Sequence, residues 1–216
     1  MVWSSGDQLA IFKQSTVPAK YQISENHVGK TSGSFYKVFS DEFTAGFRLD
    51  HNDAIYPYQE YLSIEKLDTD TPISSYRISG LVLPSEQIYA GKSFGAGTFP
   101  MTSVSDNYEL VFRNLCGGMK IQLCGKCKVK SIKVQGNKGE ILAGTSSVDA
   151  YAVTRMPTVK ITANQSATIT LDCGNGVQLN PDIPTCFVMS VLPVKFSNGF
   201  TVTVTDKIWQ RNGCKR

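Results

Sequence analysis

The chain has 216 residues and a formal net charge of +4, with 41% hydrophobic and 19% charged residues. That composition supplies an ordinary apolar core and excludes a chain that is disordered by composition. No apolar run approaches the ~20 residues of a membrane-spanning helix. The first residues also lack the basic region and apolar core of a secretory signal peptide.

The two halves of the chain differ in charge. Residues 1–105 carry eight Lys and Arg against eleven Asp and Glu, which gives −3, and residues 106–216 carry fourteen against seven, which gives +7. The change predicts an N-terminal β domain with irregular loops over residues 1–105 and a C-terminal β-sandwich domain over residues 106–216.

A basic half can indicate nucleic-acid binding. The basic cluster here consists of four lysines along one expected strand: Lys126, Lys128, Lys130 and Lys133. No aromatic residues are interleaved with them to stack on bases, so we interpret them as a solvated strand. We therefore expect no nucleic-acid partner.

The first half predicts few regular elements. Period-two alternation of apolar residues indicates strands within residues 3–13, 35–39 and 76–83. A short helix is expected within residues 58–67, and residues 84–98 are expected to form a loop. Residues 42–55 show no clear period.

The stretch over residues 108–123, YELVFRNLCGGMKIQL, contains two apolar runs joined at Gly117-Gly118. In each run apolar and polar side chains alternate, which is the period of a strand. Paired glycines permit the positive φ angles of a tight reversal. We therefore predict a β-hairpin that opens the C-terminal domain.

Alternating apolar residues continue through the second half. The apolar register along residues 128–134 shifts between Val129 and Ile132, which predicts a β-bulge. Further strands are expected at residues 140–143, 159–163, 167–173 and 200–205, with turns at 136–139 and 173–176. Residues 186–192 are apolar on both faces and are expected to form a central strand. The predicted fold class is all-β, with two consecutive β-sandwich domains and little helix.

Residues 91–95, GKSFG, match the G-x-S-x-G pattern of a hydrolase nucleophile elbow. The pattern needs a strand before it, a helix after it and a histidine later in the chain. Both histidines, His27 and His51, precede it, so we interpret the segment as a glycine-rich loop. An esterase that uses Ser93 is kept only as a hypothesis to be tested.

Two segments, residues 29–31 and 91–93, are similar to the end of a phosphate-binding loop. The first glycine of that loop would fall at Ser24 and at Glu86, so neither segment fits. We expect no cofactor.

Cys124 and Cys127 form a C-x-x-C pair. A zinc site would need two further ligands at metal-binding spacing, and the sequence offers none. A redox pair of the thioredoxin type lies at a helix start, whereas this pair lies between two expected strands. We interpret it as a turn with two thiols, bridged or free. No catalytic, cofactor-binding or metal-ligating residue is assigned, and the protein is predicted not to be an enzyme.

Four blocks of the second half stand in a characteristic order: YELVFRNLCGGMKIQL, VKSIKVQGNKGEILAG, ATITLDCGNGVQL and VMSVLPVKFSNGFTVTVTD. WSSGDQLAIF, IYPY and FPMTS add to them in the first half. Together these blocks resemble the fimbrillin family, the fimbrial subunits and related surface lipoproteins of Bacteroides-type bacteria. The resemblance runs from about Trp3 to about Asp206.

The resemblance implies two transthyretin-like β-sandwiches in a non-enzymatic structural protein of the cell surface, located in the outer membrane or a fimbrium. It implies either a pilus subunit or a fimbria-associated adhesin that assembles by β-strand addition. Expected partners are other fimbrial subunits, identical or different, and host or bacterial surface ligands. Membrane attachment is expected only through a lipid anchor. No lipidation cysteine precedes Trp3 and the alternation stops after Thr205, so no functional residue is transferred from the family.

The alternative hypothesis is a secreted glycan-binding module. β-Sandwiches often bind sugars on exposed aromatic rings, which four residues offer here: Tyr56, Tyr58, Tyr61 and Trp209. We favour the interpretation that the tyrosines pack in the N-terminal core.

Overall fold

The computed structural model describes residues 2–13, 16–38, 52–67, 75–151 and 156–206. Regular structure in these ranges is almost entirely β, and the one helical element among them is the 3-10 turn η1 (Glu25–His27). No helix of the described ranges is long and apolar enough to cross a membrane. The prediction of an all-β sandwich fold with little helix is confirmed.

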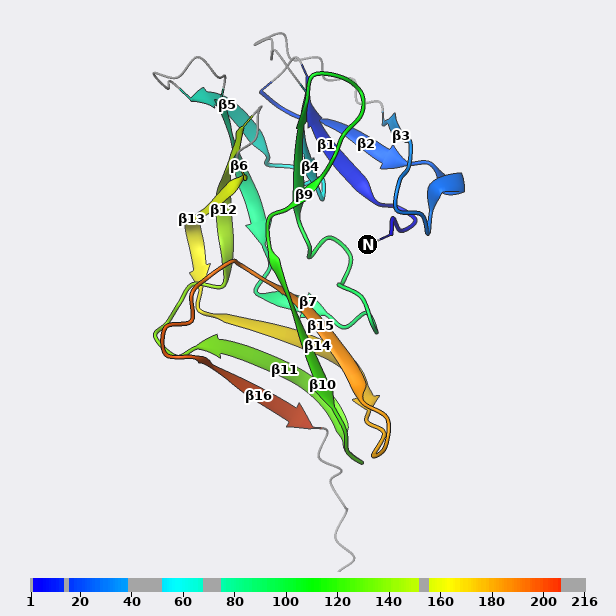
Figure 1. Cartoon of the computed structure of the whole chain (residues 1–216), viewed down its shortest axis with the longest axis vertical. Helices are drawn as coiled ribbons and strands as arrows, with labels where there is room; N and C mark the ends of the chain where they lie inside the picture. Colours follow the sequence, from blue (N-terminus) through cyan, green and yellow to red (C-terminus); the bar gives the residue numbers. More distant parts are fainter. Residues whose placement is uncertain (1, 14–15, 39–51, 68–74, 152–155, 207–216) are drawn as a thin grey trace, which may run out of the picture.

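The strands build two β-sandwiches that lie end to end along the long axis of the molecule (Figure 1). In the first sandwich, a six-stranded sheet has the order β3-β2-β1-β4-β8-β9, and a four-stranded sheet has the order β13-β12-β6-β5. The strands of the larger sheet are β1 (Gln8–Phe12), β2 (Ala19–Ile23), β3 (Phe35–Lys37), β4 (Asn52–Tyr56), β8 (Met101–Ser105) and β9 (Arg113–Asn114). Those of the smaller sheet are β5 (Ser63–Leu67), β6 (Ser75–Leu83), β12 (Ala143–Tyr151) and β13 (Thr158–Ser166).

In the second sandwich, a two-stranded sheet, β10-β15, faces a four-stranded sheet in the order β16-β11-β14-β7. Its strands are β7 (Glu86–Ile88), β10 (Gly117–Leu123), β11 (Lys128–Gly136), β14 (Thr168–Gln178), β15 (Thr185–Val191) and β16 (Phe200–Asp206). Neighbouring strands are antiparallel except β7 and β14, which are parallel.

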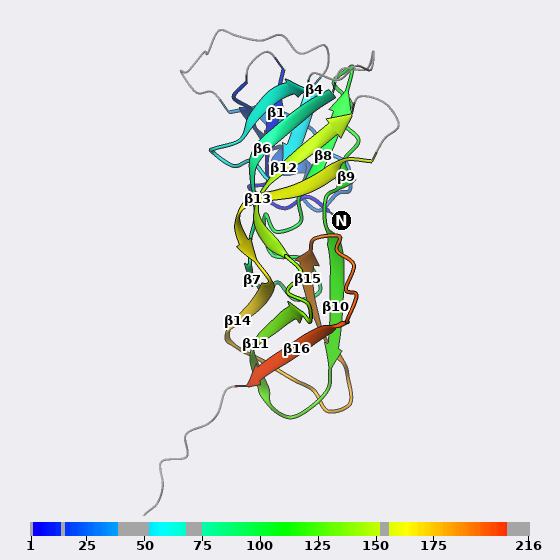
Figure 2. The same ribbon diagram turned by 90° about the vertical axis from the view of Figure 1, so that its left-hand side faces the viewer.

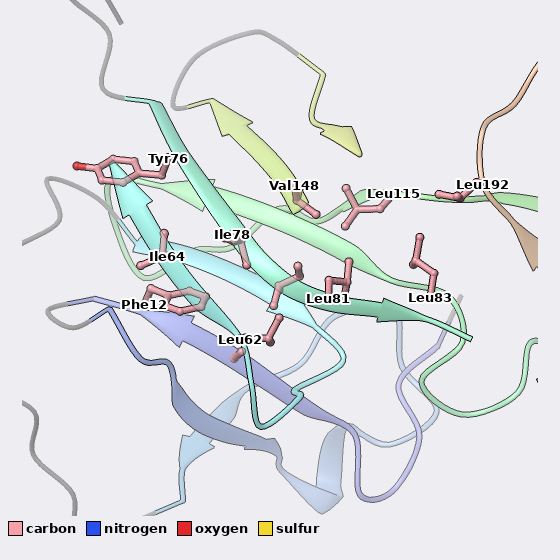
Figure 3. Close-up of a cluster of buried hydrophobic side chains, with 12 residues drawn as sticks. Phe12, Leu62, Ile64, Tyr76, Ile78, Leu81, Leu83, Leu115, Val148 and Leu192 are labelled. Atoms are coloured by element: carbon pink, nitrogen blue, oxygen red, sulfur yellow. The ribbon is translucent and has the colours of Figure 1, made fainter. Parts of the chain in front are cut away.

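Each sandwich has its own core. In the first, Phe12 of β1, Ile64 of β5 and Ile78 of β6 converge between the sheets (Figure 3). In the second, fully buried side chains from β11, β14 and β15 meet, including Ile132, Leu171 and Phe187. Full burial of one such side chain contributes about 1.5–3 kcal/mol.

The boundary predicted between residues 1–105 and residues 106–216 does not separate the two sandwiches. β12 and β13 pair into the sheet of β6 and β5, whereas β7 pairs with β14. The chain therefore crosses between the sandwiches several times, as the colours in Figure 2 show. The difference in charge reflects the composition of consecutive segments. Which sheet a strand joins depends instead on its pairing with distant segments.

The predicted hairpin over residues 108–123 is wrong. β9 pairs with β8 in the first sandwich, and β10 pairs with β15 in the second. Gly117 and Gly118 lie inside β10, and neither has a positive φ. A Cβ on Gly118 would lie 2.8 Å from Cζ of Phe94, so close ring packing, rather than a turn, requires a glycine there.

Two further expectations are corrected. The helix expected within residues 58–67 is replaced over its second half by β5, because Ile64 pairs with Ile78 and both enter the first core. The turn expected at residues 173–176 lies inside β14, where the chain bulges opposite β11. The β-bulge predicted between Val129 and Ile132 is confirmed by a shift of register between Val129 and Ser131.

The run over residues 186–192 does not form the centre of a large sheet. It contributes to β15, whose one strand partner among the described residues is β10. Its inward side chains, Phe187 and Met189, enter the second core, and Ser190 on its other face is buried as well. Because the other face is half-buried at Cys186 and Val188 and buried at Ser190, neither face of the strand is exposed, which accounts for the apolar pattern on both faces.

Candidate functional site

The second sandwich has sheets of unequal width. Among the described residues, two strands, β10 and β15, lie across from its four-stranded sheet. The two-stranded sheet lies toward the β7 side, because Gln87 of β7 bonds to Ser190 of β15, and the rings of Tyr89 and Phe187 lie 5.2 Å apart. The opposite side of the larger sheet ends in β16.

Apolar side chains on β16 are exposed although they face the core. Val202 and Val204 pair with Val134 and Ile132 of β11, and directly paired side chains lie on one face of a sheet. Val134 and Ile132 are 0% exposed, whereas Val202 is 37% and Val204 is 41% exposed. Phe200, two residues earlier on the same face, is 45% exposed. The core-facing side of β16 is therefore only partly covered.

β10 shows the same gradient within the two-stranded sheet. Met119 and Ile121 pair with Met189 and Phe187 of β15. The β15 partners are 0% exposed, whereas Met119 and Ile121 are only partly buried against the second core. Within the described residues β10 pairs with β15 alone, so alternate backbone N–H and C=O groups along its other edge point away from a strand partner.

At Ser190 the other edge of the two-stranded sheet is closed by a side chain. Gln87 Nε2 donates to the carbonyl oxygen of Ser190 at 2.9 Å, and the Ser190 N–H donates to Gln87 Oε1 at 2.9 Å. One amide, with a donor and an acceptor, thus replaces a neighbouring strand at Ser190. Gln87 is 2% and Ser190 is 4% exposed, so water does not compete for these bonds. The outer edge of β10 has no strand partner within the described residues.

We call β10 and β16 together the open edge of the second sandwich. It combines backbone groups on β10 that can form ladder hydrogen bonds with partly exposed apolar side chains on β16, chiefly Val202 and Val204. An added strand whose side chains alternate would satisfy the backbone with hydrogen bonds and cover the apolar strip with every second side chain. The open edge is chemically suited to binding a β-strand.

The motifs considered from the sequence do not have the structural context that their chemistry requires. Ser93 is exposed in the loop between β7 and β8, without the strand–turn–helix context of a nucleophile elbow. Cys124 and Cys127 are exposed free thiols in the turn between β10 and β11. No three His, Cys, Asp or Glu side chains gather in a metal-binding arrangement among the residues described.

Two other cysteines pack as small side chains. Burial raises the pKa of the Cys116 thiol to about 12. Burial, with a smaller contribution from Asp172, raises the pKa of Cys173 to about 11. Because the thiolate is the reactive form, neither group is a nucleophile near neutral pH.

The tyrosines proposed as sugar-binding faces have different environments. Tyr56 is 7% exposed, and its hydroxyl donates to Asp7 Oδ1 at 2.9 Å. Burial raises the pKa of Tyr56, and Asp7 raises it further. Tyr58 packs against the first core, with Lys20 Nζ 4.3 Å from its ring centroid. Only Tyr61, 84% exposed, offers a free ring, and Trp209 lies outside the described residues.

The open edge is not predicted by the sequence. The alternation of Phe200, Val202 and Val204 with threonines predicts one buried face, and the structure leaves both faces of β16 exposed. The one indication in the sequence was that too few strands are available for the sheet that faces β16, so that this strand is left without full cover. Nothing within residues 200–206 distinguishes them from a fully covered edge strand.

The four second-half blocks that resemble fimbrillins include β10, β11, β14, β15 and β16 of the second sandwich, and the three first-half blocks fall on the first sandwich. The open edge is therefore built by segments that also carry the resemblance. The chain matches none of the protein-family models, curated proteins or solved structures that were compared with it.

Proposed function

We propose that this protein is a non-enzymatic structural component of the cell surface, a fimbrial (pilus) subunit or a fimbria-associated adhesin, that assembles by β-strand addition. Its place would be the outer membrane or a fimbrium. The observation that supports the proposal is the open edge, where Val202 and Val204 are 37% and 41% exposed on the core-facing side of a strand. The resemblance to fimbrillins supports the same type of assembly.

In the proposed assembly a strand from another subunit lies beside β10 and across from β16. Its main chain bonds to the outer edge of β10, and alternate apolar side chains cover Phe200, Val202 and Val204. Each apolar side chain that becomes fully buried contributes about 1.5–3 kcal/mol. A donor strand that lies elsewhere on an identical subunit would make the contact head-to-tail, and such a contact extends into a filament.

The chemistry of the open edge also limits which strands fit. Val202, Val204 and their β11 neighbours carry no charge on this face, so a Lys or Asp at an inward position of the donor would be buried without a partner. A proline in the middle of the donor would remove a ladder hydrogen bond. Apolar residues at every second position are the expected donor pattern.

The test compares two faces of one strand. Val202→Asp places a charge on the core-facing side of β16, whereas Thr203→Asp places the same charge on the opposite face, on a residue that pairs with exposed Lys133. Each variant is secreted with its native flanking sequence, and assembly is measured by light scattering and electron microscopy. We expect fibres from the wild type and Thr203→Asp, and monomers from Val202→Asp.

A photo-crosslinker introduced at position 204 identifies what lies against β16. Crosslinks to a strand of another subunit are expected, with a two-residue periodicity along that strand. A wild-type protein that stays monomeric after every processing treatment contradicts the proposal, as does assembly that Val202→Asp leaves intact. Circular dichroism of each monomer establishes that the variants are folded.

A further inference from the structure

A pocket of about 730 Å³ lies on the first sandwich, and its lining includes no residue of β10 or β16. Its floor is the outer face of the six-stranded sheet, where Leu9 and Ile11 of β1 point away from the first core that Ala10 and Phe12 enter. The segment between β8 and β9 passes over this face in Figure 1 and forms one wall. The volume lies within the ~300–1,000 Å³ usual for small-ligand sites.

One wall of the pocket is aromatic. Trp3 is half-buried and meets the rings of Phe35 and Phe112 edge to face, with centroids 5.0 Å and 5.9 Å away. Tyr21 and Met101 add apolar surface beneath them. Contacts at ring edges hold the indole of Trp3 in a fixed orientation, so the wall is rigid.

The remaining lining is rich in neutral hydrogen-bonding groups. Six side chains carry a hydroxyl or an amide: Thr31, Ser32, Ser34, Asn52, Asn107 and Tyr108. One cation, Lys13, and one carboxylate, Glu109, also line the pocket. The site is therefore neutral as a whole, and its lining combines aromatic rings with hydroxyl and amide groups.

Two contacts fix the covering segment in place. Asn52 Nδ2 donates to the carbonyl oxygen of Asn107 at 2.8 Å, and Lys13 Nζ donates to the Tyr108 hydroxyl at 2.9 Å. The ammonium of Lys13 also lies 4.3 Å from the Tyr108 ring centroid. These bonds tie the segment after β8 to β4 and to the end of β1, so the pocket is already formed without a ligand.

We propose that this pocket binds a neutral carbohydrate, with one pyranose ring stacked on the aromatic wall at Trp3. A pyranose has an apolar C–H face and a rim of neutral hydroxyls, which matches a pocket lined by aromatic rings and by hydroxyl and amide groups. An acyl chain would bury the serine, threonine and asparagine groups without hydrogen bonds, which is costly. An anionic ligand attracted by Lys13 would also meet Glu109. The site is independent of the proposed strand uptake.

The test starts from a glycan array that carries neutral and sialylated glycans, probed with the full chain. The neutral oligosaccharide bound best is then titrated by calorimetry and by tryptophan fluorescence. A Trp209→Phe background leaves Trp3 as the only indole, because the chain has two tryptophans. We expect saturable binding accompanied by a change in Trp3 emission.

Three variants locate the binding site. Trp3→Ala removes the stacking surface and should weaken binding at least about tenfold. Since Trp3 also packs on Tyr56, with ring centroids 5.6 Å apart, Ser34→Leu serves as a second variant that narrows the pocket from an exposed position. Tyr61→Ala is the control, because that ring is 84% exposed and does not line the pocket.

Loss of binding in both pocket variants, with Tyr61→Ala unchanged, supports the proposal. Absence of saturable binding to any neutral glycan overturns it, and so does binding that survives Ser34→Leu and Trp3→Ala. Preferential binding of sialylated glycans, or of palmitate in a parallel titration, assigns the pocket to another ligand class. All these measurements use the monomer, so a failure here leaves the fibre test unaffected.

Discussion

Two edge strands of this protein, β5 and β16, show what distinguishes the two sandwiches. On β5, Ile64 pairs with Ile78 and is 3% exposed. On β16, Val204 pairs with the fully buried Ile132 and yet is 41% exposed. Position at the edge of a sheet therefore does not by itself expose a core-facing side chain. The difference is that a sheet lies opposite β5, whereas the two-stranded sheet opposite β16 is too narrow to cover it.

The largest effect on stability is expected at Ile64 of β5. Truncating this buried side chain leaves a cavity in the first core, so we expect Ile64→Ala to lower the free energy of unfolding by about 2–5 kcal/mol. Urea unfolding followed by circular dichroism measures the change. A loss below about 1 kcal/mol would mean that the first sandwich is no better covered at its edge than the second.

Gln87 sharpens the comparison on the closed side of the second sandwich. Gln87→Ala leaves two buried backbone groups of Ser190 without their partners, which should cost about 2–4 kcal/mol. Gln59 provides a matched control, because its amide makes the same pair of bonds to the backbone of Val82, at 3.0 Å and 2.7 Å, in an exposed position. Water can replace that amide, so Gln59→Ala should cost less than about 1 kcal/mol. Equal losses in urea unfolding would contradict the strand-mimic role of Gln87.

Gly118 probes the point where the chain enters β10. A methyl group at this position would press on the Phe94 ring, which stacks on Phe99 with centroids 4.0 Å apart. Overpacking of this kind should make Gly118→Ala cost about 1–3 kcal/mol. In a double-mutant cycle Phe94→Ala should remove most of that penalty. If the free-energy changes of the two substitutions simply add, the strain of Gly118→Ala does not arise from the Phe94 ring.

The smallest effect is expected at the open edge. Val204 is already 41% exposed, so Val204→Ala should destabilise the monomer by less than about 1 kcal/mol. Thermal unfolding of Ile64→Ala and Val204→Ala in parallel measures the contrast directly. A loss for Val204→Ala as large as that for Ile64→Ala would show that β16 is covered in solution.

Local periodicity predicted those strands that bury one face. β11 with its bulge, and the alternating runs of β13 and β14, were predicted because Val or Ile alternates with polar residues. β4 was missed because residues 53–56 are all buried, with Ile55 in the first core and Tyr56 packed on the other side of the sheet. A strand covered on both faces has no period-two signal.

The open edge could not be predicted from the sequence, because it depends on pairing between distant segments. Gly117-Gly118 has the composition of a turn, but the room needed by Phe94 decides its conformation. Residues 200–206 have the pattern of a half-buried strand, and only the width of the facing sheet determines that their inner side stays open. Neither fact is local in sequence, so neither propensity nor alternation reports it.

The repeated crossing of the chain has a mechanical consequence. Connections pass between the two sandwiches after β6, β7, β9, β11 and β13, and Val194 packs against both cores. A force that pulls the two sandwiches apart is therefore shared by several connecting segments of the chain, instead of acting on a single linker. Proteolytic cleavage of any one connection would leave the remaining connections to hold the two sandwiches together. The protein therefore resists mechanical separation of its sandwiches even after a single cleavage.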